Sequence, residues 1–174
     1  MKINICLAAS LLLLLHAGFA AQLPPGFAEE QIATGLDPTS MAMTPDGRIL
    51  ITQKSGQVLI VENGQLLPDP MLEIEVDNYN ERGLGGIAID PDFELNGWFY
   101  VFYTVPGANH NRVSRFTAVG NYALPDSEVI LFELDEMSGT IHNGGAMAFG
   151  LDGKLYLSAG DGANSGNAQN LNTT

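Results

Sequence analysis

Short apolar runs separated by glycine-containing turns set the pattern of this chain. Two such runs, 146–149 and 154–159, flank the dipeptide Asp152-Gly153. Short strands joined at Asp-Gly are typical of a β-hairpin. The same order occurs around Pro45-Asp46-Gly47, and again between 86–93 and 98–103, where Asn96-Gly97 separates the runs. The pattern therefore predicts three copies of one hairpin unit.

The spacing of the three copies indicates the architecture. Ala42, Ala88 and Ala148 correspond, as do the three turn aspartates Asp46, Asp92 and Asp152, and the spacings are 46 and 60 residues. Propeller repeats have about 40–50 residues with four strands in each. An all-β chain of about three β-propeller blades is predicted, with a β-sandwich carrying coincidental Asp-Gly turns as the alternative.

The strands expected beside the hairpins are 27–34, 57–61, 72–76, 111–118 and 127–134, and no helix is predicted. The cluster Trp98-Phe99-Tyr100 alternates within a strand, which favours a place in the core between blades. Three blades cannot close a ring, and an open array leaves strand edges exposed. We therefore expect residues 21–174 to be the N-terminal part of a longer propeller.

The first twenty residues have the pattern of a secretory signal peptide. Lys2 precedes an apolar run, 7–15, and Gly18-Phe19-Ala20 places small residues before a cut after Ala20. A membrane anchor is the alternative, but the apolar run is short for a bilayer. We expect a periplasmic or secreted protein with no membrane insertion after cleavage.

Charge and cysteine content narrow the function classes. The chain has 7 Lys and Arg against 20 Asp and Glu, and loss of Lys2 makes the mature part more acidic still. Such a surface disfavours nucleic acid and anionic membranes as partners. The single cysteine, Cys6, lies within the signal segment, which excludes disulfides and thiolate chemistry from the mature chain.

The best catalytic candidate is His142, in the loop Ile141-His142-Asn143-Gly144-Gly145 just before the third hairpin. A histidine held on the backbone beside a rigid hairpin suits a catalytic group. Neutral imidazole can accept a proton near neutral pH, as the oxidation of a hydroxyl requires. A loop histidine that only forms local hydrogen bonds is the alternative.

Four segments resemble the soluble pyrroloquinoline quinone (PQQ)-dependent sugar dehydrogenases, the glucose/sorbosone dehydrogenase family. They are residues 38–48, 81–93, 111–116 and 141–145 with Gly160-Asp161. The resemblance implies a six-bladed β-propeller and a sugar substrate oxidised with PQQ and Ca²⁺. It also implies that the arginines and lysine that hold PQQ, and the Ca²⁺ ligands, lie mostly beyond residue 174, so no metal ligand is assigned here.

The resemblance also assigns roles to five residues. It makes His142 the catalytic base, Glu81 and Asp161 substrate-binding residues, and Asn143 and Gly144 cofactor-binding residues. Alternatives remain open for two of them: Glu81 could be a surface charge paired with Arg82, and Asp161 could orient His142 or be a turn-capping aspartate.

Two positions depart from the family pattern. Ile141 stands where glucose-oxidising members carry an aspartate, and since isoleucine cannot bond a hydroxyl, the sugar stays unnamed. Gly85 stands where the family usually has a leucine, a change expected to loosen packing.

Three functions follow as hypotheses. The first is a PQQ-dependent enzyme that oxidises aldose sugars or related alcohols and passes electrons to an acceptor. The second is a non-enzymatic propeller that binds a ligand or protein, and the third is a calcium-dependent lactonase.

The sequence 160–166 lacks the spacing of a dinucleotide loop, and the Asp161, Asn164 and Asn167 run lacks the closing glutamate of a calcium loop.

Overall fold

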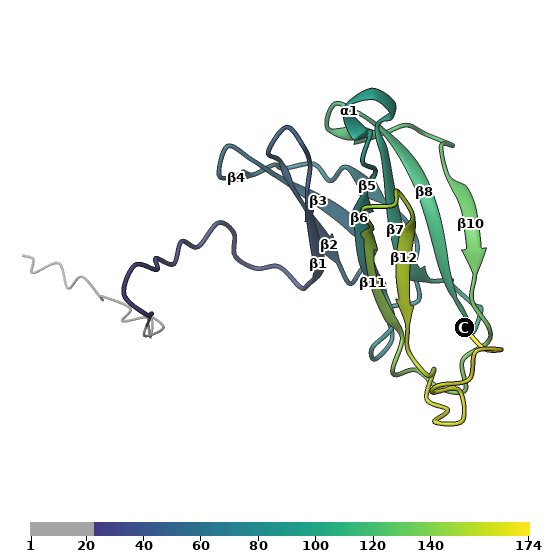
Figure 1. Ribbon diagram of the computed structural model, residues 1–174. Coiled ribbons are helices and arrows are strands. Elements are labelled where there is room, and N and C mark those ends of the chain that lie inside the picture. Colours follow the sequence, from purple (N-terminus) through teal and green to yellow (C-terminus); the bar gives the residue numbers. More distant parts are fainter. Residues whose placement is uncertain (1–22) are drawn as a thin grey trace, which may run out of the picture. The chain divides into compact units, whose positions relative to one another are not determined.

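The computed structural model describes residues 23–174, and its strands follow the predicted hairpin order. The predicted signal peptide lies outside the described residues. Residues up to Glu30 are assigned to a unit of their own, in which Pro24–Phe27 form a turn. All strands belong to the unit Gln31–Thr174 (Figure 1).

The first sheet contains β1 (Pro38–Met43), β2 (Ile49–Gln53), β3 (Gln57–Glu62), β4 (Gln65–Leu66) and β5 (Leu72–Glu73). The first four strands follow one another as an antiparallel meander. Strand β5 pairs with β3, beside β4, and is shorter than the predicted strand 72–76.

The second sheet contains β6 (Leu84–Ile89), β7 (Trp98–Thr104), β8 (Asn111–Val119), β9 (Tyr122–Ala123) and β10 (Val129–Glu133). Its order is β10-β8-β7-β6, with β9 paired to β8. A two-stranded sheet of β11 (Gly144–Phe149) and β12 (Leu155–Ala159) follows. Two sheets of five strands and a third hairpin, each sheet in order along the chain, confirm the predicted propeller blades.

Each turn of the repeat uses a glycine with positive φ, a conformation open to residues without a β-carbon. The angles are +90° at Gly47, +67° at Gly97 and +74° at Gly153. The second copy differs from the prediction of no helix, because α1 (Phe93–Asn96) forms one helical turn there. The side chain of Asp90 holds that turn, accepting from the Asp92 N–H at 3.0 Å and from Asn96 Nδ2 at 2.9 Å.

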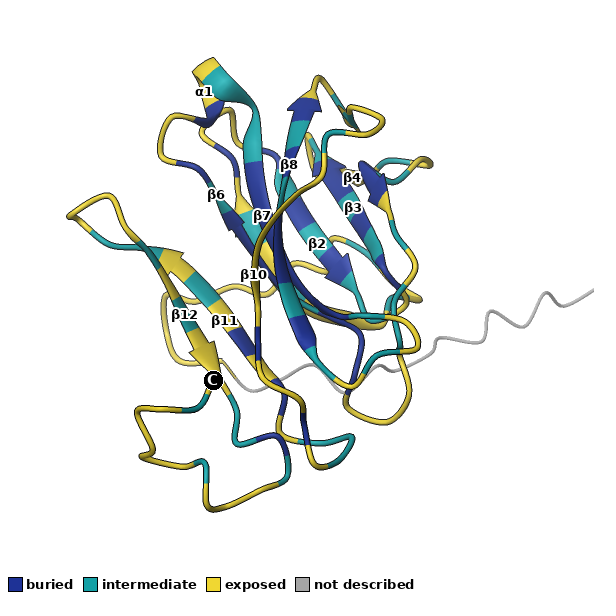
Figure 2. Ribbon diagram, turned by 90° about the vertical axis from the view of Figure 1, so that its right-hand side faces the viewer, coloured by how far each residue is buried: buried dark blue, intermediate teal, exposed yellow. Residues whose placement is uncertain are grey.

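Strand β7 supplies both cores, since its side chains alternate between two faces. Phe99, Val101 and Tyr103 pack toward the first sheet, in a core completed by residues such as Leu50. Phe102 faces the other way and packs with Met147 of the third hairpin. The buried residues concentrate along β3, β6, β7 and β8 (Figure 2).

Phe99 and Tyr100 of the aromatic cluster in β7 lie between blades, as predicted, whereas Trp98 contacts its own sheet. Tyr100 packs edge-on against Phe149 of β11, with ring centroids 5.3 Å apart. Trp98 is covered by the guanidinium of Arg115, whose Cζ lies 3.9 Å from the ring centroid. This cation–π contact covers one face of the Trp98 ring.

The predicted strand 27–34 is wrong. No strand forms there, and both Phe27 and Ile32 are exposed. The loose alternation of apolar residues was insufficient, because a strand needs a neighbouring strand to satisfy its backbone groups.

Among residues 23–174, no helix is long and apolar enough to cross a membrane.

Candidate functional site

Three strand ends meet where the predicted site residues lie. Strand β6 lies between β1 and β11, and Gly85 and Gly86 of β6 face Gly144 and Gly145 of β11. Because β11 pairs antiparallel with β12, the start of β11 coincides with the end of β12. The segments before β6, before β11 and after β12 therefore converge at one edge of the blades.

His142 and Asp161 form a pair at this edge. Imidazole Nδ1 of His142 lies 2.8 Å from Oδ1 of Asp161. An ionised carboxylate can only accept, so in a neutral imidazole beside it Nδ1 carries the proton and Nε2 keeps a lone pair. The His142 side chain is 55% exposed and that of Asp161 24% exposed. The carboxylate thus fixes the orientation of an imidazole whose side chain is more than half exposed, a geometry that a proton acceptor needs.

Asp161 also fixes the loop that follows it. Its Oδ1 accepts from the Ala163 N–H at 3.0 Å, and its backbone oxygen accepts from Asn167 Nδ2 at 3.1 Å. The turn-capping alternative is therefore present together with the contact to His142. One carboxylate orders the loop and the imidazole ring.

Glu81 reaches the backbone of the same histidine. Its Oε2 accepts from the His142 N–H at 2.7 Å, and its own N–H donates to Thr140 O at 3.3 Å. Glu81 and Arg82 do not form an ion pair, so the alternative role of Glu81 is absent from the structure. The carboxylate of Glu81 therefore lies beside His142, and its Oε1 has no partner among the described residues.

Arg82, which sequence reasoning left without a role, is the buried centre of this region. Its guanidinium donates to Asp77 Oδ2 at 2.6 Å, to Gly139 O at 3.1 Å and to Asn109 Oδ1. The pKa of Asp77 lies below its usual value, because the carboxylate accepts from the Tyr79 N–H and from Arg82. The sequence shows that Arg82 follows Glu81. It does not show the partners of Arg82, because they come from distant segments.

The two residues predicted to bind the cofactor have roles within the chain. The Asn143 side chain is buried, and its Oδ1 lies 3.4 Å from Asn111 Nδ2, while its Nδ2 has no partner among the described residues. Gly144 has a φ of +78°, and a β-carbon there would lie 2.6 Å from Gly160 N. This glycine lets β11 and β12 approach at the His142 end of the hairpin.

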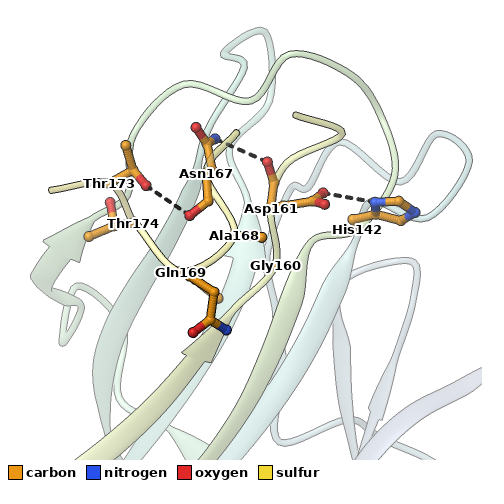
Figure 3. Close-up of a pocket in the computed structure, with 9 residues that line it drawn as sticks. His142, Gly160, Asp161, Asn167, Ala168, Gln169, Thr173 and Thr174 are labelled. Carbon is orange, nitrogen blue, oxygen red and sulfur yellow. Dashed lines mark hydrogen bonds and ion pairs between the residues drawn. The ribbon is translucent and has the colours of Figure 1, made fainter. Parts of the chain in front are cut away.

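A hollow of about 440 Å³ opens beside His142 and Asp161. Figure 3 shows the imidazole and the carboxylate on one side, with Asn167, Gln169 and Thr173 among the other lining residues. His142 and Asp161 are the ionisable members of the lining given by the described residues. The hollow thus presents a base and neutral hydrogen-bonding groups to a polar molecule.

His110 lies outside this hollow. Its Nε2 is 3.4 Å from Glu133 Oε1, and its side chain is 21% exposed. Within residues 23–174 no group of three or more His, Cys, Asp and Glu side chains could hold a metal ion.

Known proteins of similar sequence and fold point to one family. The family model described as Glucose / Sorbosone dehydrogenase matches residues 36–174. A structure from Thermus thermophilus, described as an oxidoreductase (glucose dehydrogenase), superposes with a TM-score of 0.74 and 31% identity, covering 83% of this chain and 43% of that one. The PQQ-bound aldose sugar dehydrogenase of Streptomyces coelicolor superposes with a TM-score of 0.72 and 27% identity, covering 83% and 44%.

A relative of a different description is also similar. The Hedgehog-interacting protein of Mus musculus is 31% identical over an alignment of 154 residues, and the match covers 76% of this chain and 22% of that protein. The chain thus spans less than half the length of each of these three proteins.

Proposed function

Since the chain belongs to the glucose/sorbosone dehydrogenase family, we propose that the protein is a PQQ-dependent oxidoreductase that oxidises aldose sugars or related alcohols. The observation that carries this proposal is the pair of His142 and Asp161, 2.8 Å apart at the edge of a hollow. A solved relative of the same fold is described as a PQQ-bound aldose sugar dehydrogenase. The pair supplies the base that such an oxidation needs.

The proton is moved by His142. Its Nε2, free because Nδ1 is bonded to Asp161, accepts the proton of the sugar hydroxyl as hydride leaves the same carbon. Asp161 then faces an imidazolium, and its charge stabilises that state while holding the ring in place. PQQ, when bound, would accept the hydride, and Ca²⁺ would supply Lewis-acid polarisation of the quinone.

The substrate contacts are assigned to two carboxylates. Glu81 uses Oε2 for the His142 N–H, which leaves Oε1 to accept from a sugar hydroxyl. Asp161 uses Oδ1 for both of its side-chain contacts, which leaves Oδ2 for the same purpose. Ile141, half-buried next to His142, offers no such acceptor, so the proposal covers aldoses as a class.

The lining of the hollow fits the reacting part of the cofactor. A base, a carboxylate and neutral amide and hydroxyl groups surround about 440 Å³. PQQ also carries carboxylates, whose charge calls for cations, and no lysine or arginine lies in the lining formed by the described part of the chain. The residues that neutralise those carboxylates and ligate Ca²⁺ are therefore assigned to other parts of the protein.

Asn143 and Gly144 are proposed to contact the cofactor. The Asn143 Nδ2, next to His142, is buried and has no partner among residues 23–174, so this donor still requires an acceptor. Gly144 is exposed and bears no side chain that would block approach to the start of β11. Both assignments rest on the family resemblance and on these two features.

The place of action is part of the proposal. The signal pattern of residues 1–20 supports export, followed by work in the periplasm or outside the cell with a separate electron acceptor. N-terminal sequencing of the exported protein tests it. A mature chain that begins at Ala21 supports export, and an intact Met1 in the periplasm contradicts cleavage.

A second function is favoured by one comparison. The similarity to the Hedgehog-interacting protein, at 31% identity, supports a propeller that binds a ligand or a protein without catalysis. The two functions differ in the need for the quinone. A protein that binds no PQQ would favour the second.

The deciding experiment is reconstitution. The complete reading frame is expressed, loaded with PQQ and Ca²⁺, and assayed by dye reduction with a panel of aldoses. The proposal predicts quinone binding at micromolar concentration or better and sugar-dependent dye reduction. Absence of quinone binding at that concentration would refute it.

A further inference from the structure

Three successive residues before β6 bind the segment that carries His142. Asn80 Nδ2 donates to Thr140 Oγ1 at 3.0 Å, and the Glu81 N–H donates to Thr140 O at 3.3 Å. The Glu81 carboxylate accepts from the His142 N–H at 2.7 Å, and Arg82 donates to Gly139 O at 3.1 Å. These bonds join two blades, since the residues are 57 to 61 positions apart in the chain.

Within the held segment, His142 has a backbone conformation that is unfavourable for residues with a β-carbon. His142 has a φ of +61°, in the left-handed region where its β-carbon crowds the following carbonyl. Its N–H bonds to Glu81, and its carbonyl accepts from the Gly162 N–H at 3.2 Å. Such a conformation persists where the surrounding bonds hold it, and strained residues of this kind cluster at functional sites.

The tripeptide Asn80–Arg82 is itself fixed, so it can hold another segment. Arg82 is 9% exposed and bonds to Asp77 at 2.6 Å and to Asn109. These hydrogen bonds fix the position of the buried guanidinium, because breaking any of them would leave a buried donor without a partner. Glu81, next to Arg82 in the chain, therefore starts from a defined position.

We propose that Glu81 is a positioning residue that holds His142 in its left-handed conformation, from which the imidazole meets Asp161. This inference rests on the proposed function for its catalytic meaning. It gives one oxygen of Glu81 a role distinct from contact with substrate. The consequence is that Glu81 controls turnover through the backbone of His142, and not only substrate affinity through a hydroxyl.

Two variants separate these roles. Glu81→Gln keeps an oxygen that can accept from the His142 N–H, whereas Glu81→Ala removes the acceptor. Glu94→Ala is the matched control, because Glu94 is an exposed glutamate in α1 whose side chain forms no hydrogen bond within residues 23–174. Cooperative thermal melting of each variant first establishes that it folds.

The first measurement needs no cofactor. Hydrogen exchange of the His142 amide is measured in the quinone-free full-length protein, resolved to that residue. Loss of a charge-assisted hydrogen bond predicts exchange about tenfold faster or more in Glu81→Ala, with smaller changes in Glu81→Gln and none in Glu94→Ala. Unchanged exchange in Glu81→Ala would overturn the positioning role.

The second measurement uses the reconstituted enzyme. A displaced base predicts a fall in kcat of about tenfold to a hundredfold in Glu81→Ala, similar for every aldose, with KM little changed and partial rescue in Glu81→Gln. A raised KM at unchanged kcat would instead make Glu81 a substrate ligand alone and overturn the proposal. Failure of the unaltered protein to bind PQQ would remove the proposed function, while the exchange result still decides whether Glu81 holds His142.

Discussion

Replacing Asp161 by asparagine weakens one bond of the site while preserving its shape. The substitution keeps an oxygen that can accept from both His142 and the Ala163 N–H, so the loop after β12 stays capped. It removes the charge that would face an imidazolium. The predicted effect is therefore on turnover, with little effect on folding.

The magnitude follows from the contact itself. A hydrogen bond to a charged group contributes about 1.5–3 kcal/mol and a neutral one about 0.5–1.5 kcal/mol, so Asp161→Asn loses roughly 1–1.5 kcal/mol. The His142 ring is 55% exposed, which places the loss toward the lower end. Since about 1.4 kcal/mol corresponds to a factor of ten in rate, kcat should fall by about fivefold to tenfold.

The assay is steady-state dye reduction by the protein reconstituted with PQQ and Ca²⁺. Asp152→Asn is the matched control, because Asp152 makes the same kind of turn contact, accepting from the Lys154 N–H at 3.1 Å, at the opposite end of the hairpin. Asp152→Asn should leave kcat unchanged. An unchanged kcat in Asp161→Asn, or an equal fall in both variants, would refute the role given to Asp161.

Two further predictions concern the blades. Gly86→Ala should lower the free energy of unfolding by about 2 kcal/mol or more, because its β-carbon would lie 1.9 Å from Gly145 O. Gly85→Ala is the control: its β-carbon would lie 3.5 Å from Phe102 Cδ1, so it should cost less than about 1 kcal/mol. Equal urea midpoints for the two variants would contradict the close approach of β6 and β11. The pKa of Asp46 is lowered to about 2, chiefly by the hydrogen bond from the Arg48 side chain. The stability that the Asp46 carboxylate contributes is therefore present above pH 4 and is lost as pH falls toward 2. Asp46 is half-exposed, so this contribution should stay below about 1 kcal/mol, and thermal melts of Asp46→Asn should lie below the unaltered protein at pH 5 and approach it at pH 2.5; a constant difference would contradict the linkage.

The sequence predicted the repeated part of the fold because turn chemistry is local. Asp46-Gly47 and Asp152-Gly153 mark hairpins wherever they stand between apolar runs. The pairing of β5 with β3 beside β4 was not predictable in this way, because it depends on how the chain returns to the sheet. The strand expected at 27–34 failed for the same reason, as periodicity alone does not supply a pairing partner.

The site divides along the same line. Residue type and family resemblance pointed to His142, Asp161 and Glu81, and the structure brings all three together. The bond from Glu81 to a backbone amide 61 residues away and the buried network of Arg82 depend on how two blades pack. Nor does a sequence reveal that His142 occupies the left-handed region, because only a small fraction of residues other than glycine adopt it, even among the enriched types such as histidine.

The central claim is that His142 is the base of a PQQ-dependent oxidation, and one substitution tests it directly. His142→Ala, compared with His110→Ala as the control histidine, is measured for turnover and for quinone affinity in the reconstituted full-length protein. Loss of general base catalysis predicts a fall in kcat of about a hundredfold to ten-thousandfold, with the Kd for PQQ changed by less than about threefold. Turnover by His142→Ala equal to that of the unaltered protein would remove this histidine from the mechanism.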